Sequence, residues 1–121
     1  MKYSIVEDIL QGLNRSTEIV SSAVVSTDGL PIATALQIGV DEDRIGAMLA
    51  AMLSLGTRSA KEVLQGSLNH SIIHTDNGYM LLFQAAESIL LTITTTRDAK
   101  LGLVLFEAKR ALKEIARHFG E

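Results

Sequence analysis

The sequence predicts an α+β fold with the element order αββαβββα. Two observations predict it. Three segments carry apolar residues every three or four positions, and five shorter segments are rich in β-branched residues and bounded by turn signals. The chain has 121 residues, of which 47% are hydrophobic and 21% are charged, so it is long and apolar enough to fold around one core. We therefore expect a single domain over residues 1–121.

The first helix is expected over residues 4–16. Ser4 and Glu7 have the S-x-x-E spacing of a capping box, in which each side chain bonds a free amide at the start of a helix. Apolar residues then recur at helical intervals, with polar residues between them. The pattern predicts a short amphipathic helix that begins at Ser4.

A β-hairpin is expected next. Residues 19–27 are mostly β-branched or small, which predicts a strand, and Asp28-Gly29 supplies the positive φ angles of a tight turn. The chain returns over residues 32–36. Because Pro31 has no N–H to donate, this second strand should lie at the edge of the sheet or begin just outside it.

A long helix is expected between Asp41 and Gly66. Asp41 indicates a cap followed by two acidic residues in the first turn, and Gly66 is a typical left-handed terminator. Large apolar residues cover about half of the circumference: Ile45, Met48, Leu49, Met52, Leu53, Leu55, Val63 and Leu64. Small residues lie opposite in the first half: Ala47, Ala50, Ala51 and Ser54. A helix that is apolar or small all round needs packing partners on two sides.

The last part of the chain predicts an antiparallel meander and a closing helix. The three strands are expected over residues 68–75, 79–86 and 88–96. Asp76-Asn77-Gly78 forms the first turn and Glu87 lies in the second. Asp98 should cap the last helix, which runs to Gly120 with one apolar stripe.

Composition and charge exclude several classes of function. Eleven Lys and Arg against fourteen Asp and Glu give a net charge of -3, and aromatic residues make up only 4%. A nucleic-acid binder normally shows a basic stripe, often with stacking aromatic residues, so we expect no nucleic-acid partner. Acidic residues follow Met1 too early for a secretory signal, and the charge-free stretch 45–57 is shorter than the about 20 residues of a spanning helix. We expect a cytoplasmic protein without membrane insertion.

No catalytic, cofactor-binding or metal-binding residue is predicted. The sequence contains no phosphate-binding loop, no nucleophile elbow and no cysteine. His70 and His74 are four residues apart, which on a strand is about 13 Å and too far for one metal ion. A metal shared between two chains stays an open alternative. His118, near the end of the last helix, is expected to interact with the helix dipole. We expect a protein that is not an enzyme.

Three segments together resemble the Roadblock family, named from dynein light chains. They are the hairpin Val24–Ala33, the strand start Gly78–Leu82 and the helix start Ala99–Val104. The resemblance covers nearly the whole chain in the right order, and the family has the same αββαβββα order. It implies a profilin-like, five-stranded antiparallel sheet with the long helix on one face and the two terminal helices on the other.

The resemblance also implies a function. Family members are non-enzymatic dimers that act as scaffolds or regulators of small Ras-like GTPases. Family dimers join through the long middle helix and the third strand, which places these residues at the interface: Ala47, Ala50, Ala51, Ser54, Leu68, His70, Ile72 and His74. Small residues let two helices approach closely, and pairing covers an open sheet edge. The chain lacks the terminal extensions of some bacterial regulators, so strong GTPase activation is not expected.

Two middle helices side by side would present a surface for the GTPase around the two-fold axis. This surface is expected to contain Met48, Met52 and Leu55, with Arg44 and Arg58 at its rim. In the alternative, these side chains are covered by the sheet, and the helices 4–16 and 98–120 bind the partner. An alternative function is a sensory domain that holds a small ligand against the sheet.

Overall fold

Helices and strands follow one another in the predicted order. The computed structural model describes residues 2–120, with side chains from residue 4 onward. The elements are α1 (Lys2–Asn14), β1 (Ile19–Ser26), β2 (Pro31–Ala35), α2 (Glu42–Leu64), β3 (His70–Thr75), β4 (Gly78–Ala86), β5 (Ile89–Thr95) and α3 (Leu101–His118). The predicted fold class is confirmed.

The strands form one five-stranded sheet in the order β2-β1-β5-β4-β3, and all four neighbouring pairs are antiparallel. β2 and β3 are therefore the two edge strands. Pro31 is the first residue of β2 and pairs with Val25 of β1. This confirms the edge position that the missing N–H of Pro31 predicts.

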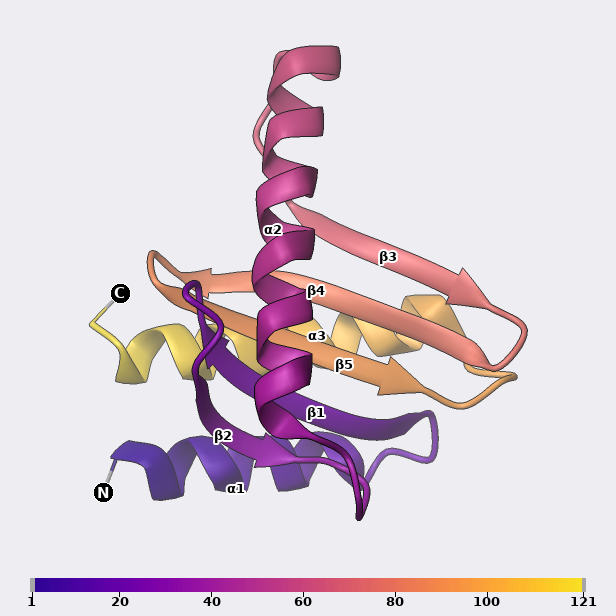
Figure 1. Ribbon diagram of the computed structural model, residues 1–121. Coiled ribbons are helices and arrows are strands. Elements are labelled where there is room, and N and C mark those ends of the chain that lie inside the picture. The colour runs from indigo at the N-terminus through magenta and orange to yellow at the C-terminus, as the bar shows by residue number, and fades with distance from the viewer. Residues whose placement is uncertain (1, 121) are drawn as a thin grey trace.

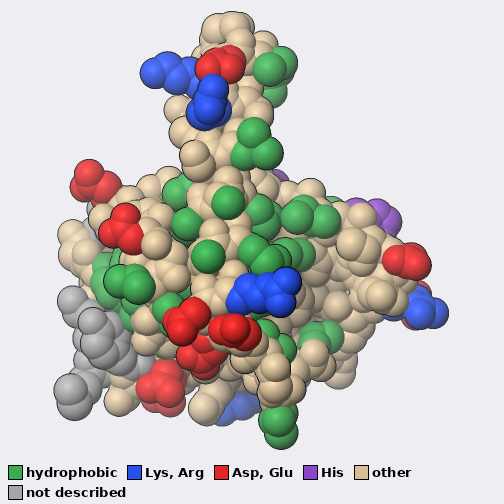
Figure 2. Space-filling model, in the orientation of Figure 1, with side chains coloured by type: hydrophobic (Ala, Val, Ile, Leu, Met, Phe, Trp, Pro, Cys, Tyr) green, Lys and Arg blue, Asp and Glu red, His purple; other side chains and the backbone are tan. Residues whose placement is uncertain are grey.

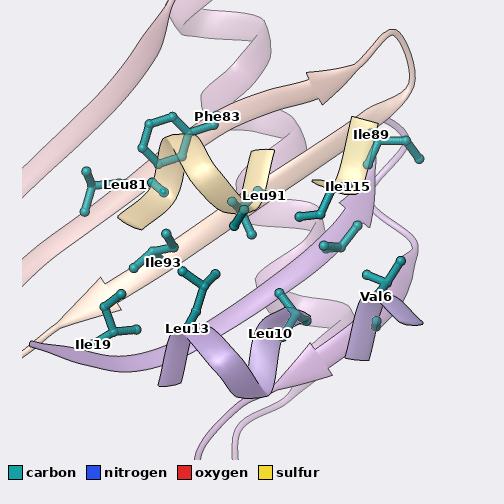
Figure 3. Packing of buried hydrophobic residues seen from close by; sticks show 14 of the residues in the cluster. Val6, Leu10, Leu13, Ile19, Leu81, Phe83, Ile89, Leu91, Ile93 and Ile115 are labelled. Carbon is teal, nitrogen blue, oxygen red and sulfur yellow. The ribbon is translucent and has the colours of Figure 1, made fainter. Parts of the chain in front are cut away.

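The helices cover both faces of the sheet (Figure 1). α1 and α3 lie side by side on one face, where their apolar residues and those of the central strands make the main core (Figure 3). Leu10 of α1, Leu91 of β5 and Ile115 of α3 are fully buried there. The core on the opposite face, beneath α2, is much smaller and contains Val25, Leu49, Leu82 and Leu90.

α2 crosses the strands and its C-terminal half projects beyond the β3 edge (Figure 1). Gly46 and Leu49, both in the N-terminal half, are the buried residues of this helix. Leu55, Val63 and Leu64 are 69%, 72% and 76% exposed. The apolar residues of the second half are exposed because the sheet ends before the helix does.

The first helix begins earlier than the capping box predicts. α1 begins at Lys2, so Ser4 lies inside its first turn instead of before it. The prediction that Ser4 caps the helix is wrong. The S-x-x-E spacing is also the spacing of two neighbours on one helix face, and the side chains of both Ser4 and Glu7 are exposed.

The start of α2 agrees with the sequence, and its end differs by one residue. The Asp41 side chain accepts hydrogen bonds from the N–H groups of Asp43 and Arg44, at 3.1 and 3.2 Å. At the other end Gln65, with φ 52°, takes the left-handed conformation expected of Gly66. The Gln65 and Gly66 N–H groups donate to the carbonyl oxygens of Lys61 and Ala60. This pair of bonds requires the reversal at Gln65.

α3 begins later than predicted, because a distant side chain binds its N-terminus. The helix begins at Leu101, and the preceding Lys100 makes no side-chain cap. The Lys100 N–H donates instead to Oε2 of Glu18, at 3.0 Å. The Thr96 N–H also donates to the Glu18 carbonyl, at 3.0 Å. The prediction that Asp98 caps this helix is wrong, since Glu18 takes that role.

Candidate interaction surface

The backbone of β4 shows which groups of β3 are free. The Tyr79 N–H donates to Oγ1 of Thr95, and the Leu81 carbonyl accepts from Oγ1 of Thr92, both at 2.9 Å. Odd-numbered residues of β4 therefore direct their backbone groups toward β5. Because backbone direction alternates along a strand, the even-numbered residues of β4 bond to β3.

The even-numbered residues of β3 consequently face the open edge. The β3 residues opposite Met80 and Leu82 are Ile73 and Ser71, which use their backbone groups to pair with β4. His70, Ile72 and His74 direct their N–H and C=O groups outward, and none of the described elements pairs with this side of β3. These three are among the predicted dimer residues, and they make β3 a free template for another strand.

The side chains of the same three residues share one face of the sheet. Register places His70 opposite Phe83 and His74 opposite Tyr79. The His70 and Phe83 ring centroids are 5.6 Å apart, and the His74 and Tyr79 rings are stacked at 4.3 Å. This is the face covered by α1 and α3, yet both histidines are exposed and Ile72 is 38% exposed.

The small residues on α2 divide into two groups. Ala47, Ala51 and Ser54 are exposed, at the i, i+4, i+7 spacing of a stripe that packs on another helix. Ala50 is half-buried. Leu68 is half-buried too, and its side chain lies against α2, where a Cβ added to Gly56 would be 3.1 Å away. The structure thus leaves three of the four small residues free on one flank of the helix.

The residues predicted to bind a partner lie beside this stripe. Met48 is 48% exposed, whereas Met52 is half-buried against the small core beneath α2. Arg44 and Arg58 are exposed, and Nη2 of Arg58 is 3.9 Å from Oε1 of Glu62. Figure 2 shows apolar side chains along the exposed length of α2 and basic side chains near its far end. The surface is thus apolar with charges at its border.

Among residues 2–120, no group of three or more His, Asp or Glu side chains is arranged to hold a metal ion. In the same part of the chain, none of the helices is long and apolar enough to cross a membrane.

Comparison with known proteins identifies the family. The family model described as the Roadblock/LC7 domain matches residues 5–95, about three quarters of the chain. The chain belongs to the Roadblock/LC7 family. The matched segment of this Roadblock/LC7 chain contains both α2 and β3 and ends at the last residue of β5. The family resemblance stated from the sequence is thus confirmed.

Relatives and solved structures agree with this assignment. The uncharacterized protein MJ1340 of Methanocaldococcus jannaschii is 37% identical to the Roadblock/LC7 chain, and the match covers 94% of this chain and 99% of MJ1340. The uncharacterized protein MJ0714 of the same organism is 36% identical, and the match covers 98% of this chain and 100% of MJ0714. A Roadblock/LC7 domain from Streptomyces avermitilis superposes with a TM-score of 0.88 at 17% identity, covering 95% of this chain and 98% of that one. Myxococcus xanthus MglB superposes with a TM-score of 0.89 at 16% identity, and the match covers 97% of this chain and 89% of the MglB chain. These structures share the fold.

Two further apolar residues of this Roadblock/LC7 chain, Val63 and Leu64, are exposed beyond the predicted surface residues. Val63 and Leu64 lie at the projecting end of α2 and were expected only as part of its apolar stripe. The length of the apolar pattern indicates this exposure, because the pattern continues further along the helix than one sheet can cover.

Proposed function

We propose that the chain forms a homodimer that serves as a non-enzymatic adaptor or regulator of a small Ras-like GTPase. The observation that carries the proposal is the combination of a projecting, partly apolar α2 with an unpaired β3 edge on the same side of the molecule (Figure 1). Membership of the Roadblock/LC7 family supports it, because the family resemblance implies this function.

A second copy of the chain satisfies both features at once. Antiparallel pairing of two β3 strands covers the free backbone groups and joins the two sheets. The same two-fold axis brings the two α2 helices together, and the flank of Ala47, Ala51 and Ser54 permits a close approach. One of the structurally similar proteins is described as MglB with tetrameric arrangement, which supports assembly as a property of this fold.

The GTPase is proposed to bind across the two α2 helices. Met48 and Leu55 supply apolar contact area there, and Arg44 and Arg58 supply charges at the rim. An apolar centre with a polar rim is typical of a transient protein interface. Because a partner on a two-fold axis excludes a second copy of itself, we expect one GTPase per dimer. Binding to a small GTPase would place the protein in the cytoplasm.

Binding to a purified small Ras-like GTPase from the source organism tests the proposal. We expect a complex of two chains with one GTPase by light scattering. Met48→Glu should weaken binding at least tenfold while the chain stays dimeric, because it places a charge in the apolar centre. Arg110→Glu, on the exposed side of α3, is the matched control and should bind normally.

Other results would contradict the model. Loss of binding with Arg110→Glu alone would move the partner to the helices on the opposite face. Calorimetry with GTP and the isolated chain should show no binding, since the sequence lacks a phosphate-binding loop. Micromolar affinity for GTP would overturn the adaptor role.

A further inference from the structure

We propose that His70 of one subunit and His74 of the partner subunit together bind a divalent transition-metal ion such as Zn²⁺. The dimer would contain two equivalent sites of this kind. The inference rests on the proposed function, because it requires two β3 strands to pair. It goes beyond that function by naming a ligand and the residues that hold it.

The free backbone groups of β3 select one register for this pairing. Only His70, Ile72 and His74 direct their N–H and C=O groups toward the open edge. In an antiparallel pair around a two-fold axis, all three are used on both strands when Ile72 lies opposite Ile72 of the partner subunit. A shift by two residues in either direction leaves one of the three without a partner.

That register places His70 directly opposite His74 of the partner subunit. Directly opposite residues on one face have Cβ atoms about 4.5–5.5 Å apart, and a zinc ion lies about 2.0–2.1 Å from each imidazole nitrogen. Two facing imidazoles can therefore reach one ion between them. The second site follows by symmetry, on the other side of the Ile72 pair.

The imidazoles are free for this role. Within the described residues neither imidazole makes a hydrogen bond, and both side chains are exposed. Their ring contacts are with Phe83 and Tyr79, on the β4 side. These contacts support the rings without occupying their nitrogens. Neutral imidazole nitrogens suit zinc, copper and nickel, and water completes the coordination.

The site cannot form within one chain. His70 and His74 are four residues apart on the same strand, which is about 13 Å. The described part of a single chain has no group of three or more potential ligands. The partner subunit therefore contributes half of each site, and metal binding and dimer formation must strengthen each other.

Zinc binding to the full-length chain, without a histidine tag, tests the proposal. We expect two zinc ions per dimer by calorimetry. When the free zinc concentration is ten times the dissociation constant of the zinc site, each site should stabilise the dimer about tenfold, so two sites should lower the dimer dissociation constant about 100-fold. Sedimentation with zinc and with EDTA measures this change. His70→Ala and His74→Ala should each remove this effect, and His118→Ala, on α3, should not.

A mixture of the two variants gives the sharper result. A heterodimer of His70→Ala with His74→Ala retains one complete site, because the remaining His74 faces the remaining His70 across the interface. We expect one zinc ion per heterodimer, isolated through two different non-histidine tags, although neither variant alone binds zinc.

Two outcomes overturn the proposal and separate it from the proposed function. A stable dimer that binds no zinc, or whose mixed heterodimer regains none, overturns the metal site and leaves the homodimer standing. A chain that remains monomeric with and without zinc overturns both.

Discussion

The backbones of Gly29 and Gly46 lie directly against each other. A Cβ on Gly29 would be 3.1 Å from the Gly46 carbonyl oxygen, and a Cβ on Gly46 would overlap the Gly29 carbonyl oxygen. The N-terminal part of α2 is thereby seated on the hairpin between β1 and β2. Because the helix is held at this end and projects at the other, its far half is available for another molecule.

Gly46→Ala should destabilise the fold. The added methyl group meets backbone that cannot rotate away, and overpacking of this kind costs about 1–3 kcal/mol. Urea denaturation should show a lower free energy of unfolding. Gly12→Ala is the matched control, since a Cβ there has nothing within 4 Å, and it should stabilise α1 by about 0.5–1 kcal/mol. Equal effects of the two variants would contradict the close contact.

Gln65→Gly should stabilise the chain by about 1 kcal/mol. Gln65 has φ 52°, a conformation that costs a residue with a Cβ about 1–2 kcal/mol and costs glycine almost nothing. Thermal unfolding should show a higher Tm. Gly66→Ala should change stability by less than about 0.5 kcal/mol, because a Cβ on Gly66 meets only the Leu64 carbonyl oxygen at 3.9 Å. If Gly66→Ala were the costly change, the left-handed residue would be Gly66.

Glu18→Ala should lower stability by about 1 kcal/mol, the usual effect of losing a helix cap. It removes the carboxylate that accepts from the Lys100 N–H. Hydrogen exchange should become faster in the first turn of α3. Asp98→Ala serves as the control and should leave both quantities unchanged. The opposite order of effects would restore Asp98 as the cap.

Ala51→Glu should dissociate the proposed dimer. Ala51 is exposed in the chain itself, so the new charge should be tolerated by the fold but would be buried without a partner between two α2 helices. Light scattering should change from about 26 kDa, twice the 13.1 kDa of one chain, to the monomer mass. Circular dichroism serves to confirm retained folding. A dimer that persists would place the interface away from this flank of α2.

Ile72→Cys should form a disulfide across the two-fold axis under oxidation. Opposite residues in an antiparallel pair have Cα atoms within the 4.4–6.8 Å that a disulfide spans. The chain has no other cysteine, so the cross-linked dimer on a non-reducing gel reports this position alone. Ser59→Cys, exposed on α2, is the comparison. Cross-linking through Ser59→Cys but not Ile72→Cys would exclude the proposed β3 register.

Local chemistry in the sequence determined the element order, the Asp41 cap and the edge position of Pro31. Each depends on neighbours in the chain: a side chain and the amides that follow it, or a residue without an N–H. The helix ends were less predictable. The capping role of Glu18 depends on a contact with Lys100, 82 residues away, which no short pattern contains.

Tertiary structure alone decided which predicted surface residues are free. Periodicity assigns Met48, Met52 and Leu55 to one side of α2, but Met52 packs partly on the sheet while Leu55 lies where the sheet has ended. Likewise, the pattern of β3 predicts a strand, but only its pairing with β4 directs the backbone of Ile72 outward. Exposure depends on where another element stops, and sequence periodicity does not contain that distance.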